Sequence, residues 1–324
     1  MEYNRETNIS INEAVYRLES QVKKENPNAL KTGFSNLDII TDGFSPGELC
    51  VIGARPAMGK TMFVFSLISY MLWKNIPVGL FSADDNLNVN YLSRLISAVK
   101  YTKPPYTYEQ RVKLIQNTTL EDVPLYLNIE QRMDIAYLRE NAIKMKEENG
   151  IKCLFIETIQ SLFENEENGT SKEGTEKTCR ELRILAQELN IPIIITSDLN
   201  RGPENRPGVD GKIPQIRDLR YGDSIECYAD KVFLLYRPEY YHICLDDEGY
   251  DLRGILTVVI AKNTYGSTGS LRLKVNNQTF LVTDIGGSMR DDVNTFKEIV
   301  QNNSALQSLS DKMDLEILKE DPPF

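Results

Sequence analysis

The sequence predicts an α/β fold in which helices flank a mostly parallel central sheet, and three observations lead to it. Apolar, β-rich runs alternate with helical stretches and cover residues 76–82, 151–158, 191–197, 231–236 and 255–261. Uninterrupted apolar strands between helices are typical of a parallel sheet that is covered on both faces. Two further runs, 270–275 and 279–283, are separated by three polar residues and predict a hairpin that closes the sheet. The third observation is a glycine-containing loop between a strand and a helix.

Residues 10–25 are predicted to form an amphipathic helix that precedes the main domain. Apolar side chains recur there at helical spacing, with Arg and Lys between them: Ile11, Ala14, Val15, Leu18 and Val22. Asn26, Pro27 and Asn28 then break the pattern. The pattern leaves open whether this helix packs on its own domain or on a neighbouring subunit.

The chain divides into three parts on this basis. An N-terminal segment with the amphipathic helix covers residues 1–28, the α/β domain covers 29–286, and a C-terminal tail covers 287–324. The tail is polar and acidic, and its last six residues are Lys-Glu-Asp-Pro-Pro-Phe. We expect a mobile segment that carries at most a short helix.

The loop that follows the apolar stretch 49–52 carries the clearest chemistry. It precedes residues 62–73, a run long enough for a buried helix, and reads Gly53-Ala54-Arg55-Pro56-Ala57-Met58-Gly59-Lys60-Thr61. In a phosphate-binding loop the amides and the helix N-terminus meet the phosphates, the lysine supplies a positive charge, and the threonine hydroxyl ligates magnesium. The order of strand, loop and helix favours this interpretation over a chance glycine-containing turn. We therefore expect residues 54–61 to bind ATP with Mg²⁺, with Ala54 standing where the motif usually has its first glycine.

Composition and charge narrow the remaining function classes. The net charge of -10 argues against a surface that binds nucleic acid everywhere, although a few basic loops lining a channel would hardly alter the total. The N-terminus lacks an apolar signal segment, and the longest apolar run, 62–73, is too short to span a bilayer, so a cytoplasmic protein without membrane contact is expected. His242 is the only histidine, which excludes a His-based metal site or a Ser-His triad.

Further segments lie in a fixed order along the chain and together resemble a known family. They read TGFSNLD (32–38), GFSPGEL (43–49), IIITSDLNR (193–201), DLRYGDSIE (218–226), LYRPEYY (235–241) and AKNTYGSTG (261–269). This set resembles the C-terminal RecA-like motor domain of the DnaB family of replicative helicases, over about residues 10–285. A RecA or KaiC type ATPase would share the phosphate-binding loop. The Asp-Leu-Arg loop and the Arg-x-Glu-Tyr-Tyr string favour the helicase.

The resemblance implies a RecA-like P-loop NTPase that assembles into a homo-oligomer, a hexameric ring, with ATP bound between neighbours and single-stranded DNA in the central channel. The helix at 10–25 matches the linker helix that docks on the adjacent motor domain. The family's N-terminal collar domain faces primase and has no counterpart in residues 1–9. Coupling to primase is therefore not carried over, whereas a helicase loader stays among the expected partners.

The resemblance also assigns catalytic positions, and this chain departs from the family at four of them. Asp84 stands where the family has its catalytic Glu, and Glu157 stands where the family has its magnesium-associated Asp. Asp198 replaces the Gln that senses phosphate. In the Lys-x-Arg element that faces the neighbour's ATP, Lys262 matches but Thr264 occupies the arginine-finger position. The expected catalytic residues are Asp84, Glu157, Asp198 and Lys262, and Glu157 shares the magnesium with the threonine of the loop.

The family's DNA-contacting loop corresponds to residues 218–224, where Arg220, Tyr221 and Gly222 are the expected contacts. Arg94 is expected to contact the nucleotide. The four departures leave two explanations open. The chain is either a working but altered helicase or a hydrolysis-impaired, ATP-binding paralogue with a regulatory or structural role.

Overall fold

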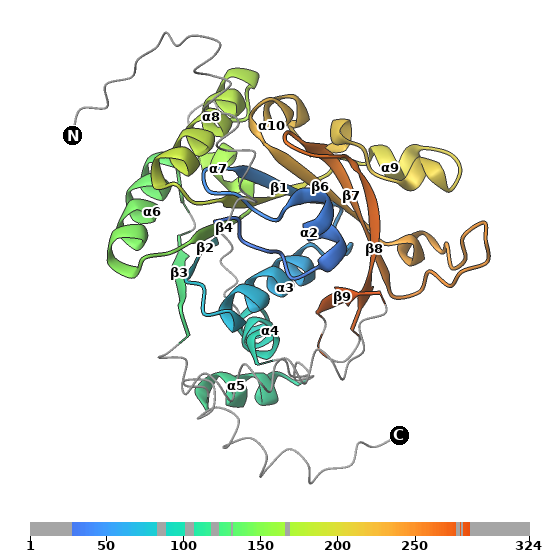
Figure 1. Ribbon diagram of the computed structural model, residues 1–324, viewed down its shortest axis with the longest axis horizontal. Coiled ribbons are helices and arrows are strands. Elements are labelled where there is room, and N and C mark those ends of the chain that lie inside the picture. Colours follow the sequence, from blue (N-terminus) through green and yellow to red (C-terminus); the bar gives the residue numbers. More distant parts are fainter. Residues whose placement is uncertain are drawn as a thin grey trace.

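The computed structural model of the chain describes residues 28–82, 89–100, 107–117, 123–130, 132–165, 169–276, 279 and 281–285 (Figure 1). The predicted helix at 10–25, Asp84 and the tail after residue 286 lie outside these residues. Within them, one nine-stranded sheet has the order β3-β2-β4-β5-β1-β6-β7-β8-β9. The strands are β1 (Leu49–Ala54), β2 (Val78–Ser82), β3 (Leu125–Ile129), β4 (Cys153–Glu157), β5 (Ile193–Asp198), β6 (Lys231–Tyr236), β7 (Ile255–Asn263), β8 (Gly269–Val275) and β9 (Val282–Asp284).

Helices connect these strands and cover the sheet. They are α2 (Ser35–Thr41), α3 (Lys60–Trp73), α4 (Val89–Val99), α5 (Tyr108–Gln116), α6 (Ile135–Asn149), α7 (Ile159–Asn165), α8 (Lys172–Leu189), α9 (Gly202–Asn205) and α10 (Gly222–Tyr228). Three short 3₁₀ turns, η1 (Asp210–Lys212), η2 (Ile216–Asp218) and η3 (Pro238–Tyr241), lie in the loops that follow β5 and β6. None of the described helices is both long and apolar enough to cross a membrane.

The sheet is mostly parallel, as predicted. The strands from β3 through β6 in the sheet order pair in parallel, and β7, β8 and β9 add an antiparallel edge. The closing hairpin predicted from 270–275 and 279–283 is confirmed as β8 and β9. The apolar run at 255–261 forms β7, which pairs antiparallel with β6. Its residues alternate between buried and partly buried, and its uninterrupted apolar composition hid both this alternation and the direction of the strand.

Two hydrophobic clusters lie on the two faces of the sheet. In β1, which is buried along its whole length, Cys50 and Ile52 face one cluster, whereas Leu49 and Val51 face the other. This alternation follows from the two-residue period of a strand. The first cluster includes α3, and the second includes α6, α7 and α8, so helices flank both faces of the sheet (Figure 1). The carboxyl ends of β1, β4 and β5 are thereby held at one common edge.

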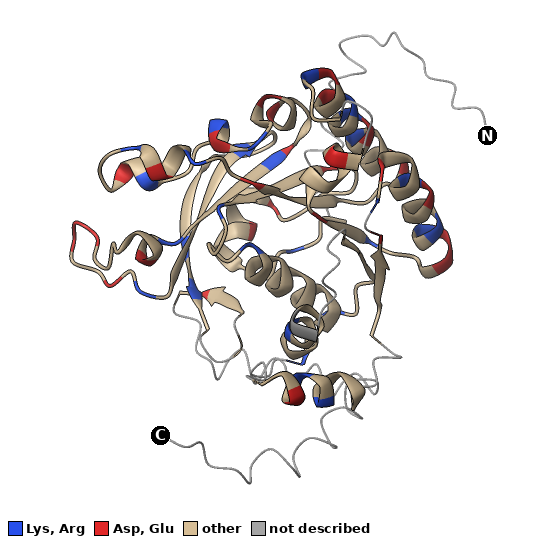
Figure 2. Cartoon of the chain, turned by 180° about the vertical axis from the view of Figure 1, so that it is seen from behind, with Lys and Arg blue, Asp and Glu red and all other residues tan. Residues whose placement is uncertain are grey.

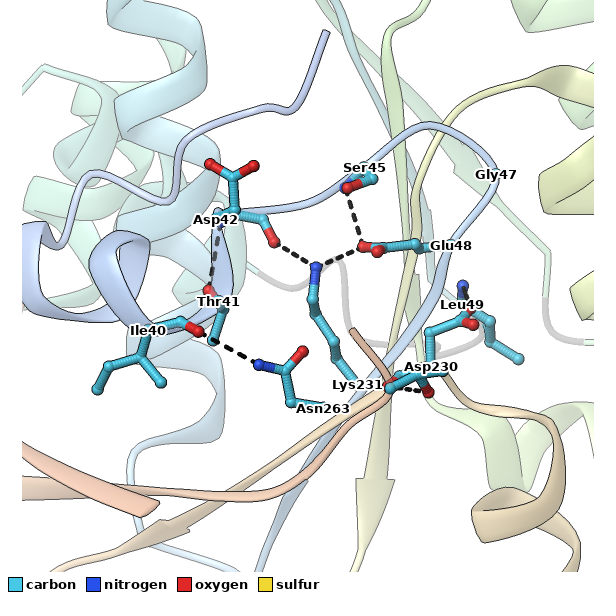
Figure 3. A network of polar contacts seen from close by, with 12 residues as sticks. Ile40, Thr41, Asp42, Ser45, Gly47, Glu48, Leu49, Asp230, Lys231 and Asn263 are labelled. Carbon is cyan, nitrogen blue, oxygen red and sulfur yellow. Dashed lines mark hydrogen bonds and ion pairs between the residues drawn. The ribbon is translucent and has the colours of Figure 1, made fainter. Parts of the chain in front are cut away.

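A buried ion pair anchors the opposite, amino-terminal edge of the parallel strands (Figure 3). Lys231, only 2% exposed, donates to Glu48 Oε2 at 2.6 Å and to the carbonyl oxygen of Gly43 at 2.8 Å. The Ser45 N–H donates to the same Glu48 oxygen at 2.9 Å. Because buried charges are costly unless they are paired and hydrogen-bonded, these contacts fasten the segment before β1 to the start of β6.

Candidate nucleotide-binding site

The predicted strand–loop–helix unit is present. The strand β1 ends at Ala54, the loop turns through a hydrogen bond from Met58 N–H to the Arg55 carbonyl at 3.2 Å, and the 14-residue helix α3 begins at Lys60. Gly59 adopts a φ of 93°, and a Cβ built there would lie 2.9 Å from Met62 Cε. A residue with a side chain would be strained at this point, so glycine fits the turn. Lys60 and Thr61 are thus the first two residues of a helix whose N-terminal amides are well placed for anions.

Lys60 and Asp198 form an ion pair between Nζ and Oδ1. Asp198 is the last residue of β5, which lies beside β1 in the sheet, and its Cα partner in the register is Ala54. The carboxyl ends of neighbouring parallel strands meet at one edge, which brings this carboxylate to the mouth of the loop. The structure therefore unites the predicted loop lysine with the predicted residue at the phosphate-sensing position.

The backbone of Asp198 is held from two further segments. Its N–H donates to Gln160 Oε1 at 3.2 Å, and its carbonyl oxygen accepts from the Arg220 N–H at 2.9 Å. Gln160, buried in α7, also donates through Nε2 to Ser197 Oγ at 3.0 Å. Gln160 was not among the predicted site residues, because no motif in the sequence marks it.

Glu157 ends β4, and its Oε2 accepts from the hydroxyl of Tyr91 at 2.7 Å. Tyr91 lies one turn before Arg94 on α4, so the two side chains share a helix face. Burial lowers the pKa of Arg94 from its ordinary value, and the charge of Glu157 opposes this shift. The structure thus brings Arg94 and Glu157 together, with Tyr91 as an additional residue that sequence reasoning did not find.

Two arginines flank the loop. The Arg55 guanidinium donates from Nε and Nη2 to Glu204 Oε1 at 2.9 and 2.7 Å, and from Nη1 to the Leu199 carbonyl at 2.9 Å. This side chain is directed at the segment after β5, which leaves the backbone of Arg55 to meet a phosphate. Arg237 follows β6, and its N–H donates to Met58 Sδ at 3.4 Å. Arg237 lies in the LYRPEYY segment (235–241), so the segment that carries the resemblance could have singled it out.

Lys262 and Thr264 lie at the other end of the parallel strands. Lys262 is paired with Val232 at the start of β6, whereas Leu235 lies beside Ala54 at the end of β1. Three residues of strand, roughly 10 Å, separate Val232 from Leu235. Lys262 Nζ donates to the Glu226 carbonyl at 2.6 Å. The structure does not bring Lys262 to the phosphate-binding loop of its own chain.

The predicted DNA-contacting loop is attached to the end of β5. Leu199 and Leu219 form an isolated antiparallel bridge, which places Arg220 directly beyond it. The exposed Arg220 guanidinium lies 5.4 Å from the centre of the Tyr221 ring. Gly222 begins α10, and a Cβ built there would lie 3.1 Å from the Ile216 carbonyl oxygen. The expected contacts therefore form one short segment that is hydrogen-bonded to the strand carrying Asp198.

Comparisons with known proteins agree with this arrangement. A sequence model of the DnaB-like helicase C terminal domain matches residues 29–283. The replicative DNA helicase DnaB of Buchnera aphidicola subsp. Baizongia pistaciae is 31% identical over 76% of this chain and 54% of its own length. That of Geobacillus stearothermophilus is 30% identical over 75% of this chain and 54% of its own length. The chain thus spans about half the length of these curated relatives.

Solved structures show the same fold. A structure described as an ATPase domain superposes with a TM-score of 0.69 at 24% identity, covering 86% of this chain and 99% of that one. A DnaB-like replicative helicase, solved with a study of its interactions with primase, gives a TM-score of 0.69 at 24% identity and covers 85% of this chain and 67% of that one. The RecA-like architecture is therefore confirmed, and the chain belongs to the family of the DnaB-like helicase C-terminal domain.

Proposed function

We propose that this chain is the motor of an ATP-dependent DNA helicase that acts in replication, hydrolyses ATP between subunits and moves on single-stranded DNA. The observation that carries the proposal is the phosphate-binding loop, whose Lys60 stands at the carboxyl edge of the sheet beside the acidic ends of β4 and β5. Membership of the helicase family supports ATP hydrolysis as the reaction. The sheet topology supports the carboxyl edge of the parallel strands as the place where ATP binds.

The residues present at the loop fit a magnesium–nucleotide complex. The Thr61 hydroxyl lies in the first turn of α3, and Glu157 presents a carboxylate from β4. Mg²⁺ prefers such oxygen ligands and usually takes one or two carboxylates together with substrate phosphates. When bound, the ion would neutralise charge on the phosphate oxygens. Lys60 and the amides at the start of α3 would hold the phosphates, and Glu157 would position the ion, with Tyr91 orienting that carboxylate through its hydroxyl.

The proposed subunit contact follows from the position of Lys262. This lysine lies at the amino-terminal edge of the strands, away from the loop of its own chain, which is compatible with a role at the nucleotide of a neighbouring subunit. We place Lys262 in that role within a hexameric ring. Thr264 has no cationic group and donates its hydroxyl to the Asp230 carbonyl at 2.9 Å. We infer slower turnover than a site with an arginine finger would give, because such a finger supplies roughly 10³ to 10⁵ in rate.

The proposed DNA contact is confined to the loop around Arg220. Basic and acidic residues are interspersed along α6 and α8, so these helices present no continuous basic face (Figure 2). Arg220 is exposed and is suited to a phosphate oxygen, while the Tyr221 ring packs edge-to-face on Phe163 with centroids 5.1 Å apart and so supports the loop that carries Arg220. A cytoplasmic location and contact with a helicase loader belong to the same proposal.

Strand separation tests the proposal directly. The chain is incubated with a forked DNA duplex and Mg²⁺, with and without ATP, and the displaced strand is quantified for wild type and Lys60→Ala. We expect ATP-dependent displacement in wild type and none in Lys60→Ala, because the lysine serves the phosphates and not the core. Lys74→Ala removes a lysine just beyond the far end of the same helix and serves as the matched control. Displacement that Lys60→Ala leaves intact would contradict the proposal.

A further inference from the structure

The lysine of the phosphate-binding loop has a carboxylate partner within its own chain. Lys60 Nζ is bonded to Asp198 Oδ1, with the lysine side chain 18% and the aspartate side chain 41% exposed. Both groups face the mouth of the loop, because one begins α3 and the other ends the strand beside β1. The ammonium that the motif offers to phosphates is therefore already bound to an anion.

Asp198 is fixed in place by its backbone. Gln160 accepts from its N–H at 3.2 Å, and the Arg220 N–H donates to its carbonyl oxygen at 2.9 Å. The parallel ladder of β1 and β5 extends as far as Asp198. These contacts keep the Asp198 backbone at the mouth of the loop, so its carboxylate remains within reach of Lys60.

Neighbouring cations have carboxylate partners of their own. Arg55 pairs with Glu204 at 2.7 Å, and Arg237 pairs with Glu239. Neither arginine is described in contact with Asp198. The charge of Asp198 is thus balanced by Lys60 in the described part of the chain, and a phosphate that draws Lys60 away meets a carboxylate of its own sign.

We propose that Asp198 competes with nucleotide phosphates for Lys60 and thereby sets both the affinity of this site and its selectivity for the number of phosphates. The inference rests on the proposed nucleotide-binding function. A single ammonium exchanges one anionic partner for another, and like charges a few ångströms apart repel strongly where water is partly excluded. Because the loop lysine reaches the β- and γ-phosphates, competition acts on ATP and ADP and spares AMP.

Asp198→Asn removes the charge while keeping the shape and a hydrogen-bond acceptor. It should tighten ATP and ADP binding by about tenfold or more and leave AMP binding within about twofold of wild type. In a Lys60→Ala background the same substitution should give a smaller gain, because only the repulsion between Asp198 and the phosphates is then relieved. Asp42→Asn removes a surface carboxylate that pairs with Lys31 at 2.6 Å, controls for the change in net charge and should leave all three affinities unchanged.

The experiment is calorimetric titration of the full chain with ATP, ADP and AMP in the presence of Mg²⁺, with circular dichroism to confirm folding of each variant. Asp198→Gln also removes the charge and replaces Asp198→Asn should the latter fail to fold. If the folded charge-free variant binds ATP no more tightly than wild type, and wild type still binds ATP, the proposed competition is overturned and the proposed function is left standing. Failure of wild type and all folded variants to bind ATP overturns both.

Discussion

Replacing Thr264 by arginine should accelerate ATP hydrolysis in the assembled protein. An arginine finger contributes roughly 10³ to 10⁵ in rate, which is about 4 to 7 kcal/mol of transition-state stabilisation. The guanidinium stabilises charge that develops on a neighbour's phosphate, which the threonine hydroxyl cannot do. Thr264 is exposed, so the longer side chain has room to leave its own chain.

Thr264→Arg removes only one of the two hydrogen bonds that Thr264 makes to Asp230. The Thr264 hydroxyl and the Thr264 N–H both donate to the Asp230 carbonyl at 2.9 Å. Thr264→Arg loses the hydroxyl contact, about 1 kcal/mol, and keeps the backbone contact that positions the loop. Even a poorly placed cation should then leave a net gain of at least about tenfold in turnover.

The assay is steady-state phosphate release at saturating ATP, with the oligomeric state confirmed by sedimentation. Thr264→Gln is the matched control, because it also loses the hydroxyl but carries no charge, and it should not accelerate turnover. An arginine acting across the interface requires nucleotide on its neighbour. Mixing Thr264→Arg with Lys60→Ala subunits should therefore lower the rate more steeply than the fraction of intact subunits. Unchanged turnover in confirmed hexamers would refute the assignment of position 264.

Four further outcomes are expected. Lys231→Met should lower the free energy of unfolding in urea by about 3 to 5 kcal/mol, because Glu48 is left buried without its partner, and a loss below 1 kcal/mol would contradict that account. Deleting residues 1–28 should convert rings into monomers at micromolar concentration in sedimentation, while circular dichroism shows that the remaining domain is folded; persistent hexamers would mean that the helix packs on its own domain. Arg220→Ala should weaken single-stranded DNA binding and reduce the salt slope by about one, which titration at several salt concentrations measures. Burial raises the pKa of Tyr236 to about 12, so the unfolded chain ionises first and stability should fall between about pH 10 and 12; Tyr236→Phe should remove part of that loss in alkaline unfolding.

Local patterns predicted the centre of the fold well. The phosphate-binding loop and α3 follow from a contiguous motif, and the buried strands β1, β5 and β6 follow from apolar runs. The strand β3 was missed, because its five residues, Leu-Tyr-Leu-Asn-Ile, lie at the sheet edge with no residue fully buried and form no apolar run. This strand forms because it pairs with β2, and a local sequence pattern does not reveal such a pairing.

The catalytic positions were predictable, but their partners were not. The resemblance assigned Asp198 to the phosphate-sensing position, and the structure shows that its carboxylate pairs with Lys60. The pairing with Lys60 depends on β5 lying beside β1, a contact between residues 138 positions apart in the sequence. Gln160 and Tyr91 were missed for the same reason. Gln160 contacts the last residue of β5 and Tyr91 contacts the last residue of β4, and only the sheet order brings these strand ends to the phosphate-binding loop.

ATP turnover with and without single-stranded DNA tests the central claim most directly, that this chain couples a working nucleotide site to DNA. Wild type and Lys60→Ala are compared at saturating ATP and Mg²⁺ over a range of single-stranded DNA concentrations. We predict hydrolysis that rises with DNA in wild type and is lost in Lys60→Ala. Tight ATP binding without turnover, with or without DNA, would contradict the motor and assign the chain to the hydrolysis-impaired class.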